Sequence, residues 1–145
     1  MLFENEEQLK AEIEKDIKAA LQETVEWVYE IIKGVTMMWY ASYEPEQYER
    51  TYQFLCSLVK TRVIKKGGEY SGEIYFDGSK IHYVTGLHPS GNQVITSAMQ
   101  GFHGATGLHE EPPTIPIWRT SIDFLDAKLY DELKKALLSH GIPIM

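Results

Sequence analysis

The chain is organised around the sequence YEPEQYERTYQFLCSL, residues 43–58, which joins a long helical segment to a strand-rich half. A simple connection needs only turn-forming residues such as Pro45, but this stretch also holds three tyrosines and an arginine. A tyrosine can bury its ring and keep its hydroxyl free to hydrogen-bond. We therefore expect either a packed hinge or a partner-binding surface here.

Within this stretch, Tyr48, Tyr52 and Leu55 are related by helical spacing, which predicts a short helix with Arg50 on its other side. The two tyrosines are expected to pack the first helix against a hairpin, with each hydroxyl bonded locally. Arg50 can pair with Glu46 at a spacing of four residues, or it can meet a neighbouring molecule. Arg50 and the basic residues just beyond it are therefore the better candidates for a partner contact.

The composition is that of an ordinary globular protein, with 43% hydrophobic and 24% charged residues in a chain of 145. A chain of this length can bury a real core, so we predict a single domain over residues 1–145. The acidic start lacks the positive and apolar regions of a signal peptide, and no apolar run approaches the ~20 residues that span a membrane. We expect synthesis in the cytoplasm and no membrane association.

The net charge of −7 argues against a free-standing nucleic-acid binder, which needs a basic footprint on its surface. One local basic cluster is formed by Lys60, Arg62, Lys65 and Lys66. It predicts a solvated strand edge or a contact for an acidic partner.

Cys56 is the only cysteine, so it has no partner for a disulfide within the chain. It lies in the apolar run of residues 54–59, where free cysteine behaves as a small hydrophobic residue. Because a reactive thiolate needs exposure and a nearby positive charge, we expect a buried structural thiol.

Residues about 5–33 are predicted to form an amphipathic helix, because apolar residues recur at spacings of three and four. These residues are Leu9, Ile13, Ile17, Leu21, Val25, Val28 and Ile32. Asn5 and Gln8 resemble a capping box, and Lys33-Gly34 suits the C-terminal end. A helix of ~28 residues spans ~42 Å, which is long for a domain of this size. Part of it is therefore expected to project or to pack against a neighbouring subunit.

A β-hairpin is predicted from residues 69–76 and 80–84, with its turn at Asp77-Gly78-Ser79. Residues 59–64 are expected to supply a further strand. One face of the hairpin is apolar and needs a cover, which the first helix can provide. The fold class is therefore α+β, with a long N-terminal helix and a C-terminal helix packed on a small antiparallel β-sheet.

The C-terminal half is predicted to hold two helices, over residues 93–100 and about 123–139, the second ending at Gly141 and Pro143. Between them, residues about 101–118 form a long flexible loop. A loop of this length usually marks function or a partner that orders it.

Candidate chemistry is sparse in this sequence. His103, His109 and Glu110 could ligate a metal, but their spacing matches no established zinc pattern. The sequence holds neither a phosphate-binding loop nor a nucleophile elbow. From the residues alone we predict no catalytic, cofactor-binding or metal-binding residue, and Met37, Met38 and Trp39 suit a core or an interface equally well.

The order of elements and two motifs carry a resemblance to a known family. The motifs are Tyr-x-Pro-x-x-Tyr-x-Arg-Thr-Tyr-x-x-Leu-x-Ser, residues 43–57, and Gly-Phe-His-Gly, residues 101–104. Across essentially its whole length the chain resembles the tail-completion proteins of long-tailed bacteriophages and prophages, also called head–tail joining or neck proteins.

The resemblance implies a non-enzymatic structural protein of the virion that needs no cofactor. It implies an α+β subunit of a ring, with a hexamer as the expected size, at the junction between head connector and tail tube. The implied partners are further copies of the chain and the neighbouring connector and tail proteins. DNA would pass through the lumen without specific binding, because an acidic wall repels phosphate.

The residues that we expect at subunit or partner contacts are aromatic, basic or close to the two motifs. They are Trp39, Tyr43, Tyr48, Arg50, Lys65, Lys66, Phe102, His103 and Trp118. Two alternatives stay open at this point: a small metal-dependent enzyme that uses the loop histidines, and a protein-binding module of a host.

Overall fold

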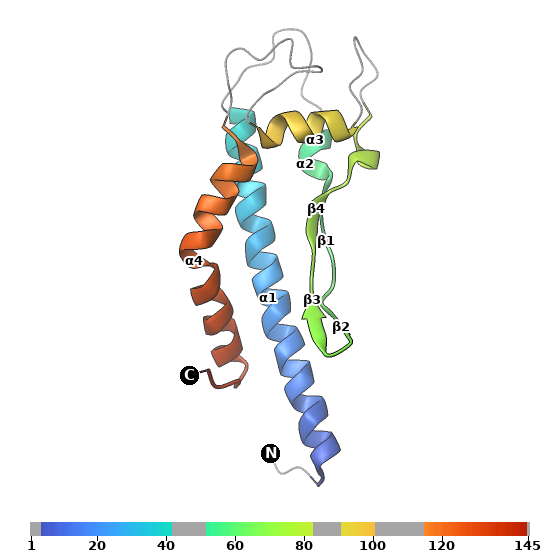
Figure 1. Cartoon of the computed structure of the whole chain (residues 1–145), viewed down its shortest axis with the longest axis vertical. Coiled ribbons are helices and arrows are strands. Elements are labelled where there is room, and N and C mark those ends of the chain that lie inside the picture. Colours follow the sequence, from blue (N-terminus) through green and yellow to red (C-terminus); the bar gives the residue numbers. More distant parts are fainter. Residues whose placement is uncertain (1–3, 42–51, 83–90, 101–114, 145) are drawn as a thin grey trace.

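The computed structural model describes residues 4–41, 52–82, 91–100 and 115–144. In these residues the long helix α1 lies between helix α4 on one side and a narrow β-hairpin on the other, with α2 and α3 at one end (Figure 1). The elements in chain order are α1 (Glu6–Ala41), α2 (Gln53–Cys56), β1 (Leu58–Lys60), β2 (Ile64–Lys66), β3 (Glu69–Ser71), β4 (Ile74–Phe76), the 3-10 helix η1 (Gly78–Lys80), α3 (Gly91–Met99) and α4 (Ile117–Ser139). The predicted α+β class is confirmed.

Helix α1 begins as the sequence predicts, but it runs on past Gly34 to Ala41. At its start, the side chain of Asn5 accepts a hydrogen bond from the Gln8 amide at 2.9 Å, and the Gln8 side chain accepts one from the Glu4 amide at 3.0 Å. The predicted end at Gly34 is wrong. A glycine costs a helix about 1 kcal/mol, which the burial of Val35, Trp39 and Tyr40 offsets.

The strands pair as one long hairpin whose turn is at Gly67-Gly68, where both residues have positive φ angles of 59° and 84°. Two successive positive φ angles are what a tight hairpin turn requires. The predicted hairpin with its turn at Asp77-Gly78-Ser79 is wrong. Those residues form η1 instead, capped by the Asp77 side chain, which accepts a hydrogen bond from the Ser79 amide at 3.0 Å.

A β-bulge interrupts the hairpin halfway along its length. The pairing of β1 with β4 ends at Lys60 and Ile74, and the pairing of β2 with β3 begins at Ile64 and Ser71. Three residues, 61–63, therefore lie opposite two, 72 and 73, and an extra residue of this kind bends the strand. The bend is what allows the narrow hairpin to follow α1.

The core lies at the end of the molecule where α1, α2, α3 and α4 meet. Its buried residues are Val35, Trp39, Tyr40, Phe54, Ile81, Val94, Ala98 and Ile117. Phe54 is fully buried and stacks on Phe76 with ring centroids 4.7 Å apart.

The short helix α2 corrects two expectations. It begins only at Gln53, because Tyr52 has a left-handed backbone with φ 58° and precedes the helix. Cys56 is exposed, so the prediction of a buried thiol is wrong. In a single helical turn, Cys56 lies on the side opposite to Phe54, and Phe54 takes the core position.

Helices α3 and α4 were both predicted as helices, but their observed ends differ from the predicted ones. The predicted helix over 93–100 is confirmed as α3, with Val94 and Ala98 buried. Helix α4 starts at Ile117, before the predicted Asp123, because the side chain of Ile117 is buried in the core. Residues 117 and 118 are thus helical and do not belong to the predicted loop.

Helix α4 ends at Ser139, and the chain leaves it through Gly141 as predicted. The Ile142 amide donates to the Leu137 carbonyl at 2.9 Å, and the Gly141 amide donates to the Leu138 carbonyl at 3.1 Å. Together with the φ of 81° at Gly141, these two bonds form a Schellman cap.

Candidate functional site

The predicted contact residues divide into two groups. Trp39, Lys65, Lys66 and Trp118 lie in the part of the chain that the structure describes. Tyr43, Tyr48, Arg50, Phe102 and His103 lie outside the described residues, as do the candidate metal ligands His109 and Glu110.

Trp39 belongs to the core and is only 5% exposed. Its ring packs edge-on against Tyr40 at 5.0 Å and against Phe54 at 5.2 Å. On the same stretch of α1, Met37 and Met38 are exposed. Trp39 thus fixes the end of α1 to α2, whereas the two methionines face away from the core.

The basic cluster of the hairpin is split between two faces by the alternation of side chains along a strand. Lys60 and Lys65 point toward α1, where Lys60 pairs with Glu26 and Lys65 pairs with Glu14. The hydrogen bond between Lys65 and Glu14 raises the pKa of the lysine and lowers the pKa of the glutamate. These two lysines therefore hold the hairpin on α1.

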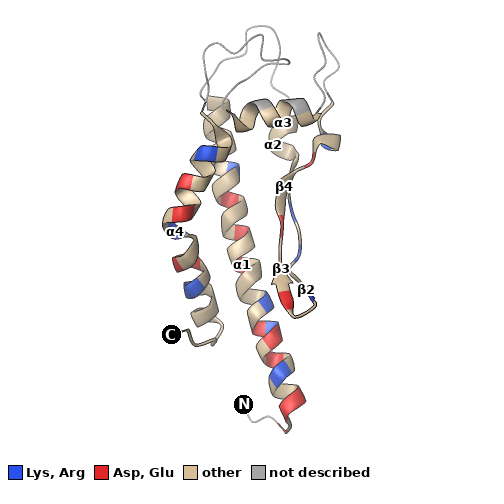
Figure 2. Ribbon diagram, viewed as in Figure 1, with Lys and Arg blue, Asp and Glu red and all other residues tan. Residues whose placement is uncertain are grey.

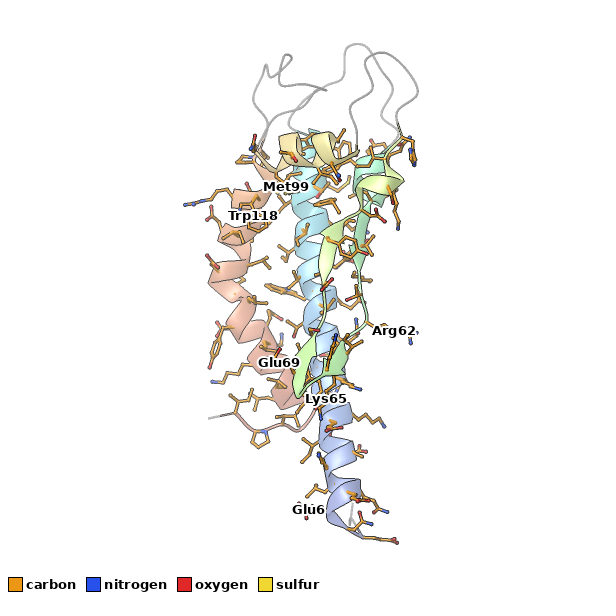
Figure 3. All side chains as sticks on the ribbon, turned by 45° about the vertical axis from the view of Figure 1, so that its right-hand side comes forward. Glu6, Arg62, Lys65, Glu69, Met99 and Trp118 are labelled. Carbon is orange, nitrogen blue, oxygen red and sulfur yellow. The ribbon has the colours of Figure 1, made fainter. Side chains whose placement is uncertain are left out.

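Ile64 and Lys66 of strand β2, and Arg62 in the bulge before it, alternate with Lys65 and lie on the opposite face. We call these three residues the β2 patch. All three are exposed, and 55% of the Ile64 surface is open to solvent. Figure 3 shows Arg62 pointing away from α1 and Glu69 on the other side of the hairpin. The β2 patch is thus an apolar residue between two bases.

The N-terminal part of α1 extends beyond both α4 and the hairpin (Figure 1). Leu9 lies there and Ile13 lies where the hairpin begins to run beside α1, since its neighbour Glu14 pairs with Lys65. Leu9 and Ile13 have 42% and 41% of their surfaces exposed. By helical spacing they share the face of α1 that further along holds Ala20, Thr24 and Trp27. Thr24 and Trp27 line a groove against α4, so this face is covered by α4 only over its upper part.

Acidic residues flank Leu9 and Ile13. Glu6, Glu12 and Asp16 each lie three residues from one of them and border the two apolar side chains, as does the single base Lys10. Figure 2 shows acidic residues along this end of α1, with basic residues between them. We call Leu9, Ile13 and these three acids the N-terminal stripe.

The outer surface of α4 also exposes large apolar residues. They are Trp118, Phe124, Leu129, Tyr130 and Leu138. Their positions are distributed around the helix, so they do not form one continuous face. Trp118, which the sequence suggests as a contact, is among the most exposed of them.

Two small grooves lie beside α1. One of about 340 Å³ is lined by Gln22, Glu26, Lys60, Thr61 and Arg62. The other, of about 230 Å³, lies between α1 and α4, near the contact of His140 Nε2 with Glu23 Oε1 at 2.6 Å. Among the described residues, no group of three or more histidine, cysteine, aspartate or glutamate side chains is placed to hold a metal ion.

Comparison with protein families gives a match over nearly the whole chain. The model of the YomN family matches residues 5–139. The chain belongs to the YomN family. This family is associated with Bacillus prophages, which supports the predicted phage-related origin and does not test the tail-completion role. Comparison with the curated proteins gave no match, and comparison with the solved structures gave none either.

None of the described helices is long and apolar enough to cross a membrane. Arg62 and Lys66 of the β2 patch belong to the predicted basic cluster, whereas Ile64 and the individual residues of the N-terminal stripe were not singled out as contact residues from the sequence. The stripe could have been found from the predicted overhang of the first helix. Which side chains share a face with Ile64 depends on the position of the hairpin turn, which lies at Gly67-Gly68 and not at the predicted residues 77–79.

Proposed function

We propose that this YomN-family chain is a structural subunit of the phage head–tail junction, a tail-completion or neck protein without a catalytic step. Its resemblance to that family extends over essentially the whole chain, and its membership of a prophage-associated family supports the same class of function. Copies of the chain would form a ring, with a hexamer as the expected size, between the head connector and the tail.

The observation that carries the proposal is the presence of two different exposed surfaces on opposite sides of α1. The β2 patch lies on the hairpin, and the N-terminal stripe lies on the face that α4 covers further along. A closed ring needs two unlike faces on each subunit, because each face must meet the other one on a neighbour.

The same proposal assigns the remaining partners. The connector and tail proteins would bind the two ends of the ring, and the net charge of −7 suits a channel through which DNA passes without binding. After synthesis in the bacterial cytoplasm, the protein would become part of the virion.

Two measurements test this function. Deleting the gene from its prophage should lower the titre of infectious particles by several orders of magnitude, and a plasmid copy of the wild-type gene should restore it. Mass spectrometry of purified particles should detect the protein in a small fixed number of copies per particle. An unchanged titre after deletion, or particles without the protein, would overturn the proposal.

A further inference from the structure

We propose that the N-terminal stripe of one copy packs on the β2 patch of a second copy, so that copies join head to tail. This inference rests on the proposed ring function and identifies the surfaces that would build the ring. Its occupant is a second copy of this chain.

Both surfaces combine an exposed apolar centre with charges at its margin. Leu9 and Ile13 expose about two fifths of their surfaces, and Ile64 exposes 55%. A packed contact would remove this apolar surface from water, which favours association. Within the described residues, neither surface is covered by another element of its own chain.

The charges at the two margins are opposite. The stripe carries Glu6, Glu12 and Asp16, whereas the β2 patch carries Arg62 and Lys66. Opposite charges at the rim of an interface favour one partner and one register. The other two bases of the hairpin, Lys60 and Lys65, are engaged by α1 within the chain.

Further charges lie next to both surfaces. Lys10 follows Leu9, but it also acts on Glu14 on the hairpin side of α1, whose pKa it helps to lower. Glu69 and Glu73 lie on the returning half of the hairpin, and Glu69 is the register partner of Lys66, so these two side chains lie next to each other and Glu69 offsets part of the charge of Lys66. The basic character is therefore concentrated on the β2 side, around Arg62.

The N-terminal stripe and the β2 patch also lie at similar positions along the axis of α1. Lys65 pairs with Glu14, which places Ile64 close to the level of Ile13 on α1. The stripe and the patch lie on opposite sides of the helix at that level. A neighbour that is displaced sideways, with little shift along α1, would therefore bring its β2 patch against the stripe.

The charges disfavour a symmetric contact of the same surfaces. In a stripe-to-stripe dimer, Glu12 and Asp16 of one copy would face the same acids of the other, and like charges placed together cost free energy. The structure thus favours the head-to-tail arrangement, which can continue from copy to copy and close as a ring.

Disulfide cross-linking tests the contact directly. A variant with Leu9→Cys and Ile64→Cys, built on Cys56→Ser because Cys56 is exposed, should give a ladder of linked copies when it is oxidised. The control carries Leu9→Cys and Tyr130→Cys, since Tyr130 is exposed on α4 away from the β2 patch. A ladder from the first variant and not from the control is expected. No ladder, an equal ladder from the control, or dimers from Leu9→Cys alone would overturn the contact.

Charge reversal provides a second, independent test. The pair Glu12→Lys with Asp16→Lys, and the pair Arg62→Glu with Lys66→Glu, should each lower the self-association constant at least about tenfold. The variant with all four changes should recover association, because the opposite charges again face each other. Association that is unchanged in the double variants, or lost in all three, contradicts the proposal.

The failure of the contact and the failure of the function can be told apart in the prophage. If both double variants restore the titre of a deletion strain as the wild type does, the ring uses other surfaces and the proposed function stands. If the deletion strain itself keeps a normal titre, the proposed function fails whatever the cross-links show.

Discussion

The side chain of Gln22 accepts a hydrogen bond from the backbone amide of Val63 at 3.0 Å, and this bond joins the middle of α1 to the bulge of the hairpin. Beside it, Gly72 packs against α1 so closely that an added Cβ would lie 2.7 Å from Cγ2 of Val25. The hairpin is thus fixed to the helix where its register changes, between the ion pairs of Lys60 and Lys65.

The bond of Gln22 yields a prediction for stability. Gln22→Ala removes the acceptor of the part-buried Val63 amide and should lower the free energy of unfolding by about 1–2 kcal/mol. Gln22→Glu keeps a side-chain oxygen in the same place and serves as the matched control. Urea denaturation measures both, and an alanine variant as stable as the glutamate variant would show that this bond contributes nothing.

The contact between η1 and α3 depends on two glycines. A Cβ on Gly91 would lie 2.7 Å from the carbonyl carbon of Gly78 and would overlap the backbone there. Gly91→Ala should therefore destabilise the protein by about 1–3 kcal/mol. Gly34→Ala is the control, since its Cβ meets nothing within 4 Å and alanine favours a helix by about 1 kcal/mol. The Tm measured by thermal unfolding should fall for Gly91→Ala and rise for Gly34→Ala. A shift of both Tm values in the same direction would contradict the structure.

The pair of Glu14 and Lys65 predicts a dependence of stability on pH. The folded pKa of Glu14 lies below its usual value of 4.5, so its contribution is present above about that pH and is lost as the pH falls through the folded pKa. The folded pKa of Lys65 lies above 10.5, so its contribution is lost as the pH rises through that folded value. The difference in urea midpoint between wild type and Glu14→Gln should be largest near pH 7 and should shrink toward pH 3. A difference that stays constant over this range would be inconsistent with the ion pair.

Substitutions of Cys56 and Phe54 should have very different effects on stability, although the two residues are close in the sequence. Cys56 is exposed, so a thiol reagent should modify it in the folded protein, and Cys56→Ser should change stability by less than about 0.5 kcal/mol. Phe54 is fully buried, so Phe54→Ala should cost about 3–5 kcal/mol. A thiol that reacts only after unfolding would contradict the placement of α2.

The sequence predicted the elements whose signals are local and periodic. The apolar spacing of α1, the cap at Asn5 and the exit of α4 at Gly141 all depend on neighbouring residues and were confirmed. The end of α1 was wrong because burial of Val35 and Trp39 in a core assembled from distant segments outweighs the local cost of Gly34. The helix propensities of neighbouring residues contain no information about this burial in the core.

The predicted position of the hairpin turn was wrong for a similar reason. Gly67-Gly68 and Asp77-Gly78 are both turn signals, and only pairing across the bulge and contact with α1 select the first. The split of the basic cluster followed from that choice, because the register decides which lysines face α1. The face of the hairpin that carries Ile64 therefore became recognisable only from the folded chain, whereas the overhang of the first helix and the basic cluster were expected from the sequence.

Electron microscopy of particles produced without this gene tests the account most directly. A head–tail joining subunit predicts filled heads and complete tails that remain separate, and joined particles when the wild-type gene is returned on a plasmid. Intact tailed particles at the wild-type frequency in the deletion strain would contradict the central claim.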